Sequence, residues 1–170
     1  LICVHRIDVP VSGVIVLAKS KKVATHLGNQ FKERNVKKTY LAISRFNNAE
    51  QKGSWKDMIL KHRKGNKSGL VKEHEKAKEA RAAFEYVEGL EHIHLWKLFP
   101  QTGRHHQLRV QMSSHIGPIR GDQKYGDKRG NKDRSIDLHA YEITFVHPAT
   151  QKQVTFVAPP PSKSPWTHFT

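Results

Sequence analysis

The sequence predicts an α+β fold in which a mixed, mostly antiparallel β-sheet is flanked by helices. Three observations support this prediction. Several short stretches alternate apolar and polar residues with the period of a strand, only two have the period of a helix, and the strands do not alternate regularly with helices. With 170 residues the chain has the length of one domain and can bury a core without covalent cross-links. We therefore predict a single domain over residues 1–170, with a Pro-rich tail at residues 159–170.

The chain begins with a polar loop that runs into the first predicted strand, an uninterrupted apolar stretch at residues 14–18. Such a stretch is typical of a strand that is buried on both faces. Pro10 restricts the loop backbone and Gly13 permits the turn into the strand, so we expect a stiff loop at the edge of a rigid core. The loop carries Arg6 and Asp8, and the spacing alone fits either an ordinary ion pair or a carboxylate held in place for chemistry.

The first predicted helix follows this strand. Ser20 is a suitable N-cap, and Val23, Leu27 and Phe31 recur every four residues as the apolar face of an amphipathic helix. We expect the helix to end near Asn35.

A strand is predicted at residues 36–44, because side chains there alternate between two faces. Tyr40 shares one face with Lys38 and Ala42, while the opposite face is mainly apolar. A tyrosine in a strand usually serves packing, so the spacing alone does not assign a function to Tyr40.

Residues 46–78 lose this periodicity and are rich in Gly, Asn, Lys and His, which predicts a long loop. The piece K-G-N-K-S-G within it lacks the glycine spacing of a phosphate-binding loop, so we expect no nucleotide site there. We interpret residues 61–72 as a mobile basic arm that either contacts nucleic-acid phosphates or is simply solvated.

Residues 80–87 and 93–99 are predicted to form an antiparallel hairpin that turns at Gly89, with Trp96 in the core. The hairpin leads to Thr102 and to the second predicted helix.

Near the end of the chain, two closing strands are predicted at residues 138–146 and 154–158, before a run of prolines that cannot continue a sheet.

The second helix is predicted at residues 103–115, with Thr102 as its N-cap. Leu108 and Met112 are four residues apart and should face inward, and Arg109 can be presented to a neighbouring element. Three histidines in this region lack the spacing and the cysteine partner of a zinc site, so we expect no metal.

The composition is strongly basic. Thirty Lys and Arg residues against fifteen Asp and Glu give a formal net charge of +15 and a pI near 10.1. Such a field attracts polyanions, which makes nucleic acid the first partner to consider. The alternative is a ribosome-associated or merely soluble basic protein, because net charge determines association rather than chemistry.

Cysteine use and hydropathy indicate the compartment. Cys3 is the only cysteine, so no intramolecular disulfide can form. No apolar run approaches the ~20 residues that cross a bilayer, and no export signal is visible at the start. We expect a cytoplasmic protein that does not contact membranes.

Four stretches resemble the motifs of the RluA-type RNA pseudouridine synthases. The first motif is similar to H-R-I-D-V-P-V-S-G-V-I-V-L-A-K at residues 5–19, and the second to K-T-Y-L-A at residues 38–42. The third is similar to T-G-R-H-H-Q-L-R-V-Q at residues 102–111, which is followed by P-I-R-G-D-Q-K-Y-G at residues 118–126. The closing motif is similar to L-H-A-Y-E-I-T-F-V-H-P at residues 138–148. All four occur in the family's order, over nearly the whole chain.

This resemblance implies the pseudouridine synthase catalytic fold and an isomerase, without a cofactor, that acts on a flipped-out uridine in a loop or bulge of rRNA or tRNA. It implies that Asp8 acts at the sugar, that Tyr40 lies against the uracil, and that Arg109 pairs with Asp8. The remaining candidates are RNA contacts, which we expect to be made by Arg6, Arg104, His106, Lys61, Arg63, Lys64 and Lys67.

The chain also departs from the family pattern. Val11 stands where the family prefers Thr, and Gln111 where it often has His. Family members generally have further sheet-forming sequence before the first motif, so the resemblance predicts a domain that lacks its N-terminal strands. We expect a monomer.

Several alternatives remain open at this stage. The aspartate can act as a nucleophile at C1′ or as a base that removes a proton from C2′. A catalytically silent RNA-binding or ribosome-assembly module with the same fold is the rival function. A hydrolase built on the carboxylates and histidines is the third option.

Overall fold

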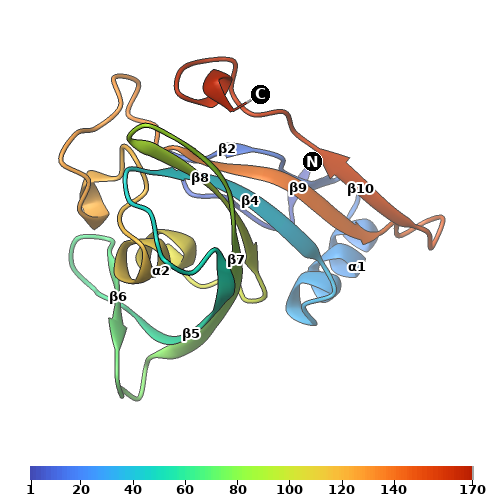
Figure 1. Ribbon diagram of the computed structural model, residues 1–170. Coiled ribbons are helices and arrows are strands. Elements are labelled where there is room, and N and C mark those ends of the chain that lie inside the picture. Colours follow the sequence, from blue (N-terminus) through green and yellow to red (C-terminus); the bar gives the residue numbers. More distant parts are fainter. Residues whose placement is uncertain (170) are drawn as a thin grey trace.

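The computed structural model describes residues 1–169 and is built around one curved sheet (Figure 1). Seven strands follow the order β10-β9-β4-β8-β7-β5-β6, and β2 is attached beside β9. Neighbours along this path are antiparallel, whereas β2 and β9 are parallel. The predicted fold class, a mixed and mostly antiparallel sheet with flanking helices, is confirmed.

The elements have the following bounds. The strands are β1 (Ile2–Cys3), β2 (Ser12–Gly13), β3 (Leu17–Ala18), β4 (Lys37–Ser44), β5 (Lys52–Lys61), β6 (Ser68–Val71), β7 (Lys78–Leu90), β8 (Ile93–Pro100), β9 (Leu138–Val146) and β10 (Gln153–Val157). The helices are α1 (Lys21–Lys32) and α2 (Gln107–His115), with short 3-10 helices η1 (Gln123–Tyr125) and η2 (Trp166–His168).

Two helices cover different parts of the sheet and each closes a separate apolar cluster. The helix α2 lies within the curve of the sheet beside β5 and β6, where Leu108 and Met112 pack against Trp96 (Figure 1). The helix α1 lies near the other end of the sheet, where Leu27 packs with Phe145. The strand β4 runs between β8 and β9 and so joins the two halves of the molecule.

The first helix, three of the strands and one hairpin were predicted correctly from the sequence. The Ser20 side chain accepts a hydrogen bond from the Val23 amide, and the predicted apolar face of α1 packs on the sheet. The strands β4, β9 and β10 lie where expected, and Trp96 is fully buried. The β7–β8 hairpin is also present, but it turns at Glu91 because Gly89 is still paired with His94.

The prediction of one buried strand at residues 14–18 was wrong. Only Leu17 and Ala18 pair, with β1, while β2 pairs with β9. Ile15 is 44% exposed and Leu17 is 39% exposed. The backbone leaves the extended conformation at Gly13, with φ +122°, and the Val14 amide makes the last hydrogen bond to β9, to the Ala140 carbonyl. A Cβ at Gly13 would lie 2.2 Å from the Ala140 carbonyl oxygen, so the close approach requires glycine.

The prediction of a long loop at residues 46–78 was also wrong, because β5 and β6 form a hairpin there. In β5, Trp55 and Ile59 are buried at alternate positions, with Asp57 between them on the same side. Asp57 accepts hydrogen bonds from Gln111 and His115 of α2. A polar residue at an inward position concealed the alternation in the sequence.

The second helix begins four residues later than predicted, at Gln107, and Thr102 is not its N-cap. The Thr102 hydroxyl instead donates to the Gln107 side chain and accepts from the Arg81 amide. His106 occupies the N-cap position in a left-handed conformation, with φ 53° and ψ 25°. The intervening residues form a turn whose backbone faces the site described below.

The Pro-rich tail follows β10 without extending the sheet. Trp166 in this tail is buried and packs against Leu41, Ile43 and Leu95. Among residues 1–169, no helix is both long enough and apolar enough to cross a membrane.

Candidate active site

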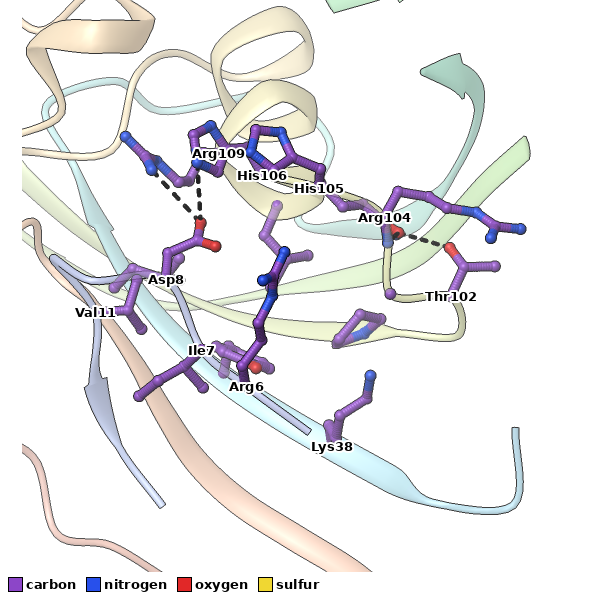
Figure 2. Close-up of a pocket in the computed structure, with 16 residues that line it drawn as sticks. Arg6, Ile7, Asp8, Val11, Lys38, Thr102, Arg104, His105, His106 and Arg109 are labelled. Carbon is purple, nitrogen blue, oxygen red and sulfur yellow. Dashed lines mark hydrogen bonds and ion pairs between the residues drawn. The ribbon is translucent and has the colours of Figure 1, made fainter. Parts of the chain in front are cut away.

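A cavity of about 180 Å³ lies between the Asp8 loop, β4 and the turn before α2 (Figure 2). Six of the ten residues predicted from the sequence line it. They are Arg6, Asp8, Tyr40, Arg104, His106 and Arg109. The structure therefore brings together groups that are distant in the sequence, among them Asp8 and Arg109, which are 101 positions apart.

The Asp8 loop is held from behind by β9 and the residues before it. The Val11 amide donates to the Asp8 carbonyl at 2.9 Å, and the Ile136 amide donates to the Pro10 carbonyl at 2.9 Å. His139 on β9 has Nε2 2.9 Å from the Ala158 carbonyl and Nδ1 2.8 Å from the Ser12 hydroxyl. Since a carbonyl only accepts, Nε2 is the donor and Nδ1 accepts from Ser12. These bonds fix the position of the carboxylate.

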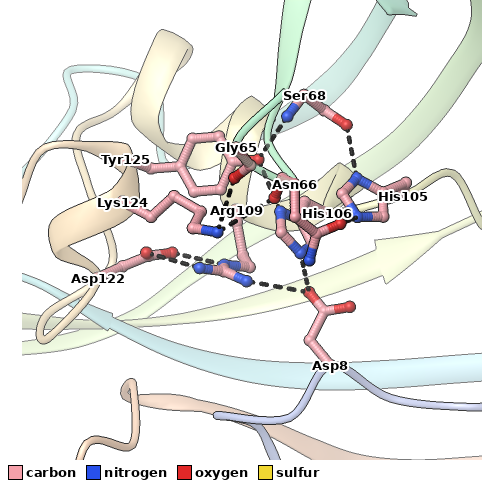
Figure 3. Close-up of polar contacts among 10 residues, drawn as sticks. All are labelled: Asp8, Gly65, Asn66, Ser68, His105, His106, Arg109, Asp122, Lys124 and Tyr125. Atoms are coloured by element: carbon pink, nitrogen blue, oxygen red, sulfur yellow. Dashed lines mark hydrogen bonds and ion pairs between the residues drawn. The ribbon is translucent and has the colours of Figure 1, made fainter. Parts of the chain in front are cut away.

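The guanidinium of Arg109 lies between two carboxylates. Its Nε and Nη2 donate to Asp122 at 2.7 and 2.8 Å, and its Nη1 lies 3.5 Å from Asp8 Oδ2 (Figure 3). Arg109 is 5% exposed and Asp122 is 1% exposed, whereas the Asp8 side chain is 31% exposed. Burial by itself lowers the pKa of Arg109, but the hydrogen bonds and charge of Asp122, together with Asp8, raise it overall. Arg109 is thus a permanent cation, held by Asp122 and directed at Asp8.

Tyr40 forms part of the cavity wall opposite α2. It is carried by β4, on the same face as Ala42, and packs against the main apolar cluster. Burial, and then the charge of Asp8, raise the pKa of Tyr40 to about 12. At neutral pH its hydroxyl is therefore a neutral donor. Apolar side chains complete this wall of the cavity, and they come from Ile7, Val11, Leu108 and Leu138.

Cations line the outer side of the cavity. Arg6 is exposed and Lys38 is half-buried, and within residues 1–169 neither side chain has a hydrogen-bond or ion-pair partner. Both extend into the open space of the cavity (Figure 2). Arg104 is held by a 2.8 Å hydrogen bond from its Nε to the Glu79 carbonyl. Burial lowers the pKa of Lys38, as expected for an amine without a counter-ion.

The remaining predicted RNA contacts lie on the β5–β6 hairpin, which was expected to be a mobile arm. Lys61, Arg63, Lys64 and Lys67 are all exposed there. The hairpin is attached to the site, because Lys124 Nζ donates to the Gly65 and Asn66 carbonyls. Lys61 and Asn66 also line a second hollow, of about 450 Å³, on the other side of Asp8.

The sequence reasoning missed several residues of the site, among them Asp122, Tyr125, Lys38 and Lys124. A signal for three of them was present in the stretch P-I-R-G-D-Q-K-Y-G, which follows the third motif but from which no site residue was predicted. No group of three or more His, Cys, Asp or Glu side chains in the described part of the chain is placed to hold a metal ion.

The sequence model of the RNA pseudouridylate synthase family matches residues 1–114. The chain belongs to this family. The match contains Asp8, Tyr40 and Arg109 and stops before Asp122.

This chain of the RNA pseudouridylate synthase family has curated relatives in bacteria. It is 33% identical over 169 aligned positions to the ribosomal large subunit pseudouridine synthase C of Pasteurella multocida (strain Pm70), covering 92% of the chain and 50% of that protein. It is 30% identical over 177 aligned positions to the tRNA pseudouridine synthase C of Haemophilus influenzae (strain ATCC 51907 / DSM 11121 / KW20 / Rd), covering 91% of the chain and 72% of that protein. The chain thus spans about half the length of the first relative.

Solved structures of human proteins have the same fold. The chain superposes with a TM-score of 0.80 on human RNA pseudouridylate synthase domain containing 1, at 29% identity, covering 94% of this chain and 69% of that one. For human RNA pseudouridylate synthase domain containing 4, the TM-score is 0.79 at 24% identity, with coverage of 95% and 72%.

Proposed function

We propose that the chain is an RNA pseudouridine synthase, with residues 1–170 as its catalytic domain, that isomerises a uridine of structured rRNA or tRNA to pseudouridine. Membership of the family supports this proposal, and relatives named for the large ribosomal subunit and for tRNA support the choice of RNA classes. The observation that carries it is the Asp8 carboxylate. One of its oxygens faces the buried Arg109 cation, while the carboxylate as a whole lies at the wall of an open cavity.

The reaction moves the sugar from one atom of uracil to another. The N1–C1′ bond breaks, the uracil rotates, and a C5–C1′ bond forms; C5 then loses the proton that N1 gains, so substrate and product have the same atoms. An ionised Asp8 serves either by forming a bond to C1′ as N1 leaves or by removing the C2′ proton. In both routes the Arg109 charge compensates the carboxylate in a poorly solvated site.

The cavity suits a base that has left its helix. Extruding a uridine costs a few kcal/mol, and less in a loop or bulge, so its contacts must offset that cost. The Tyr40 ring and the apolar wall provide the surface for the uracil. The cations on both sides of the cavity provide phosphate contacts, with Arg6 and Arg104 on one side and the β5–β6 hairpin on the other. The reaction needs no cofactor, and we place the protein in the cytoplasm as a monomer.

The Asp8→Asn variant tests this function. Pseudouridine formation should be abolished while RNA affinity stays within a few fold, because the carboxylate performs the chemistry and the positive field performs the binding. Pseudouridine is mapped on rRNA and tRNA exposed to the purified protein, with the exposed carboxylate variant Asp133→Asn as a control that should retain full activity.

The rival function predicts a different result. A silent RNA-binding or ribosome-assembly module would bind RNA and leave every uridine unmodified, in the wild type as well as in Asp8→Asn. Turnover by Asp8→Asn at the wild-type rate would contradict the assigned role of the carboxylate. Release of free uracil would indicate a hydrolase.

A further inference from the structure

Two hydrogen bonds and one longer polar contact connect the β5–β6 hairpin to the Asp8 carboxylate (Figure 3). The Ser68 amide donates to the Tyr125 hydroxyl at 2.8 Å, and that hydroxyl lies 2.7 Å from His106 Nδ1. The other ring nitrogen of His106, Nε2, lies 4.0 Å from Asp8 Oδ2. Ser68, Tyr125 and His106 are 2%, 7% and 7% exposed, so water does not replace these bonds.

The groups that face its two ring nitrogens together assign the proton on His106, because the Tyr125 hydroxyl at Nδ1 can donate whereas the Asp8 carboxylate at Nε2 can only accept. The Tyr125 hydroxyl accepts from the Ser68 amide and donates its one hydrogen to His106 Nδ1. Nδ1 is then an acceptor, and the ring proton is on Nε2, which faces Asp8. The opposite tautomer would place a nitrogen lone pair against the carboxylate. Burial, and then the charge of Arg109, lower the pKa of His106 to about 4, so the ring is neutral at neutral pH.

Neighbouring groups hold His106 in this orientation. Its left-handed backbone is uncommon outside glycine and occurs where the surroundings impose it. The His105 ring stacks on it at 3.8 Å between centroids, and His105 Nδ1 lies 2.7 Å from the Ser68 hydroxyl. The hairpin therefore reaches His105 directly, through Ser68 and Asn66, and reaches His106 through Ser68 and Tyr125.

The two oxygens of Asp8 have different surroundings. Oδ2 faces Arg109 Nη1 at 3.5 Å and His106 Nε2 at 4.0 Å. Within residues 1–169, no hydrogen bond or ion pair reaches Oδ1. Contacts of this length in a site without substrate shorten when the substrate binds. Oδ1 is thus the oxygen left to react with the sugar.

We propose that His106 is a positioning residue that donates from Nε2 to Asp8 Oδ2, and that the basic hairpin fixes its tautomer through Ser68 and Tyr125. This inference rests on the proposed function. It gives the hairpin a second role besides phosphate binding, because Ser68 at its base supports the arrangement that orients Asp8. It also moves His106 from direct RNA contact, as the sequence suggested, to the support of the carboxylate.

The tautomer is measured first, on the wild-type protein without RNA, so this test is independent of activity. Long-range ¹H–¹⁵N correlation spectra distinguish a protonated Nε2 from a protonated Nδ1. At pH 7 we expect a neutral His106 with its proton on Nε2, and in Tyr125→Phe a mixture of tautomers. Protonation on Nδ1 in the wild type would overturn the inference even if the protein modifies RNA.

Two replacements of His106 then distinguish a role as hydrogen-bond donor to Asp8 from a role in maintaining the left-handed backbone alone. The amide of Gln places an N–H near Nε2, whereas the amide of Asn places it near Nδ1. Asn tolerates the left-handed backbone better than Gln, so a purely structural role makes His106→Asn the better enzyme. The proposed role predicts the reverse, with His106→Gln within about tenfold of the wild-type single-turnover rate and His106→Asn about 10²-fold slower. Equal rates for both variants, or a faster His106→Asn, would overturn the inference.

The contribution of the hairpin contact is tested with Tyr125→Phe. This variant should lower the single-turnover rate at saturating RNA about tenfold or more and leave RNA affinity within a few fold. Tyr141→Phe is the matched control, because within residues 1–169 the Tyr141 hydroxyl has no hydrogen-bond partner. An unchanged rate in Tyr125→Phe would overturn the inference. Absence of pseudouridine from the wild type would count against the proposed function instead and leave the spectroscopic result valid.

Discussion

At the scale of single residues, the site depends on a buried charge pair that the sequence pattern did not indicate. Arg109 has Asp122 as its main partner and Asp8 as its more distant one. A buried guanidinium forms two strong parallel bonds to one carboxylate, and removal of that carboxylate leaves a buried charge unpaired. Asp122 therefore determines where Arg109 lies relative to Asp8.

We predict that Asp122→Asn lowers the free energy of unfolding by about 3–5 kcal/mol, as is typical when one partner of a buried pair is lost. It should also slow pseudouridine formation, because Arg109 is no longer held in place. Urea unfolding at pH 7 measures the first effect. Asp133→Asn, which removes the exposed partner of Lys163, is the control and should leave the unfolding midpoint unchanged. If Asp122→Asn also left the unfolding midpoint unchanged, the Arg109–Asp122 pair would not hold Arg109 in place.

Lys38 is a residue at which stability and binding are opposed. Burial lowers its pKa, so between the folded-state pKa and the ordinary lysine value of about 10.4 the unfolded chain binds more protons than the folded one. The charged amine therefore destabilises the fold at neutral pH. This penalty is present in full below the folded-state pKa and is lost as the pH rises to about 10.4.

Lys38→Met should accordingly be more stable than the wild type at pH 7, by a margin that shrinks as the pH approaches 10. It should also bind RNA more weakly, because a cation of the cavity is lost. Thermal unfolding across this pH range tests the first expectation, with the exposed neighbour Lys37→Met as the control that leaves stability unchanged. A less stable Lys38→Met would show that the amine has a favourable partner in the folded state.

At the scale of elements, the β5–β6 hairpin supports both binding and geometry. Its tip carries Arg63 and Lys64, which are exposed and have no partner in the described chain, while Ser68 at its base is buried against Tyr125. Substitutions at the tip therefore affect phosphate contacts without disturbing the bonds to His106.

Replacing Arg63 and Lys64 together with Gln should weaken binding to all RNAs and flatten the dependence of log affinity on log salt by about one to two units. The single-turnover rate at saturating RNA should not change. The control replaces two lysines far from the hairpin, Lys22 on α1 and Lys152 in the β9–β10 turn (Figure 1). If both double variants flatten the slope equally, the effect comes from net charge and not from the hairpin.

Elements with a strong local signal could be predicted from the sequence, and those shaped by distant contacts could not. The cap and apolar face of α1 depend on residues within one turn of each other, so the pattern was sufficient. In β5 the inward Asp57 is satisfied by Gln111 and His115, which are more than fifty positions away. The same holds in the site, where the motifs indicated Asp8 and Arg109, whereas the pairing of Asp122 with Arg109 follows only from the folded geometry.

At the scale of the whole molecule, the sheet connects the two sides of the site. The strand β4 carries Tyr40 between β8 and β9. The strand β9 supports the Asp8 loop, and β8 leads into the turn that carries Arg104 and His106. The positions of these side chains therefore depend on one continuous hydrogen-bonded layer, which explains how a cavity formed by such distant segments keeps a defined shape.

The two-residue pairing of β2 with β9 determines when the site can form during synthesis. Ser12 and Gly13 find their partners, His139 and Ala140, 127 positions later in the chain. At about 5–20 residues per second, a ribosome needs roughly 6–25 s to make that intervening length. The segment with Asp8 leaves the ribosome before β9 does and stays without its support until β9 emerges, so the carboxylate reaches its position only after the intervening elements have been translated.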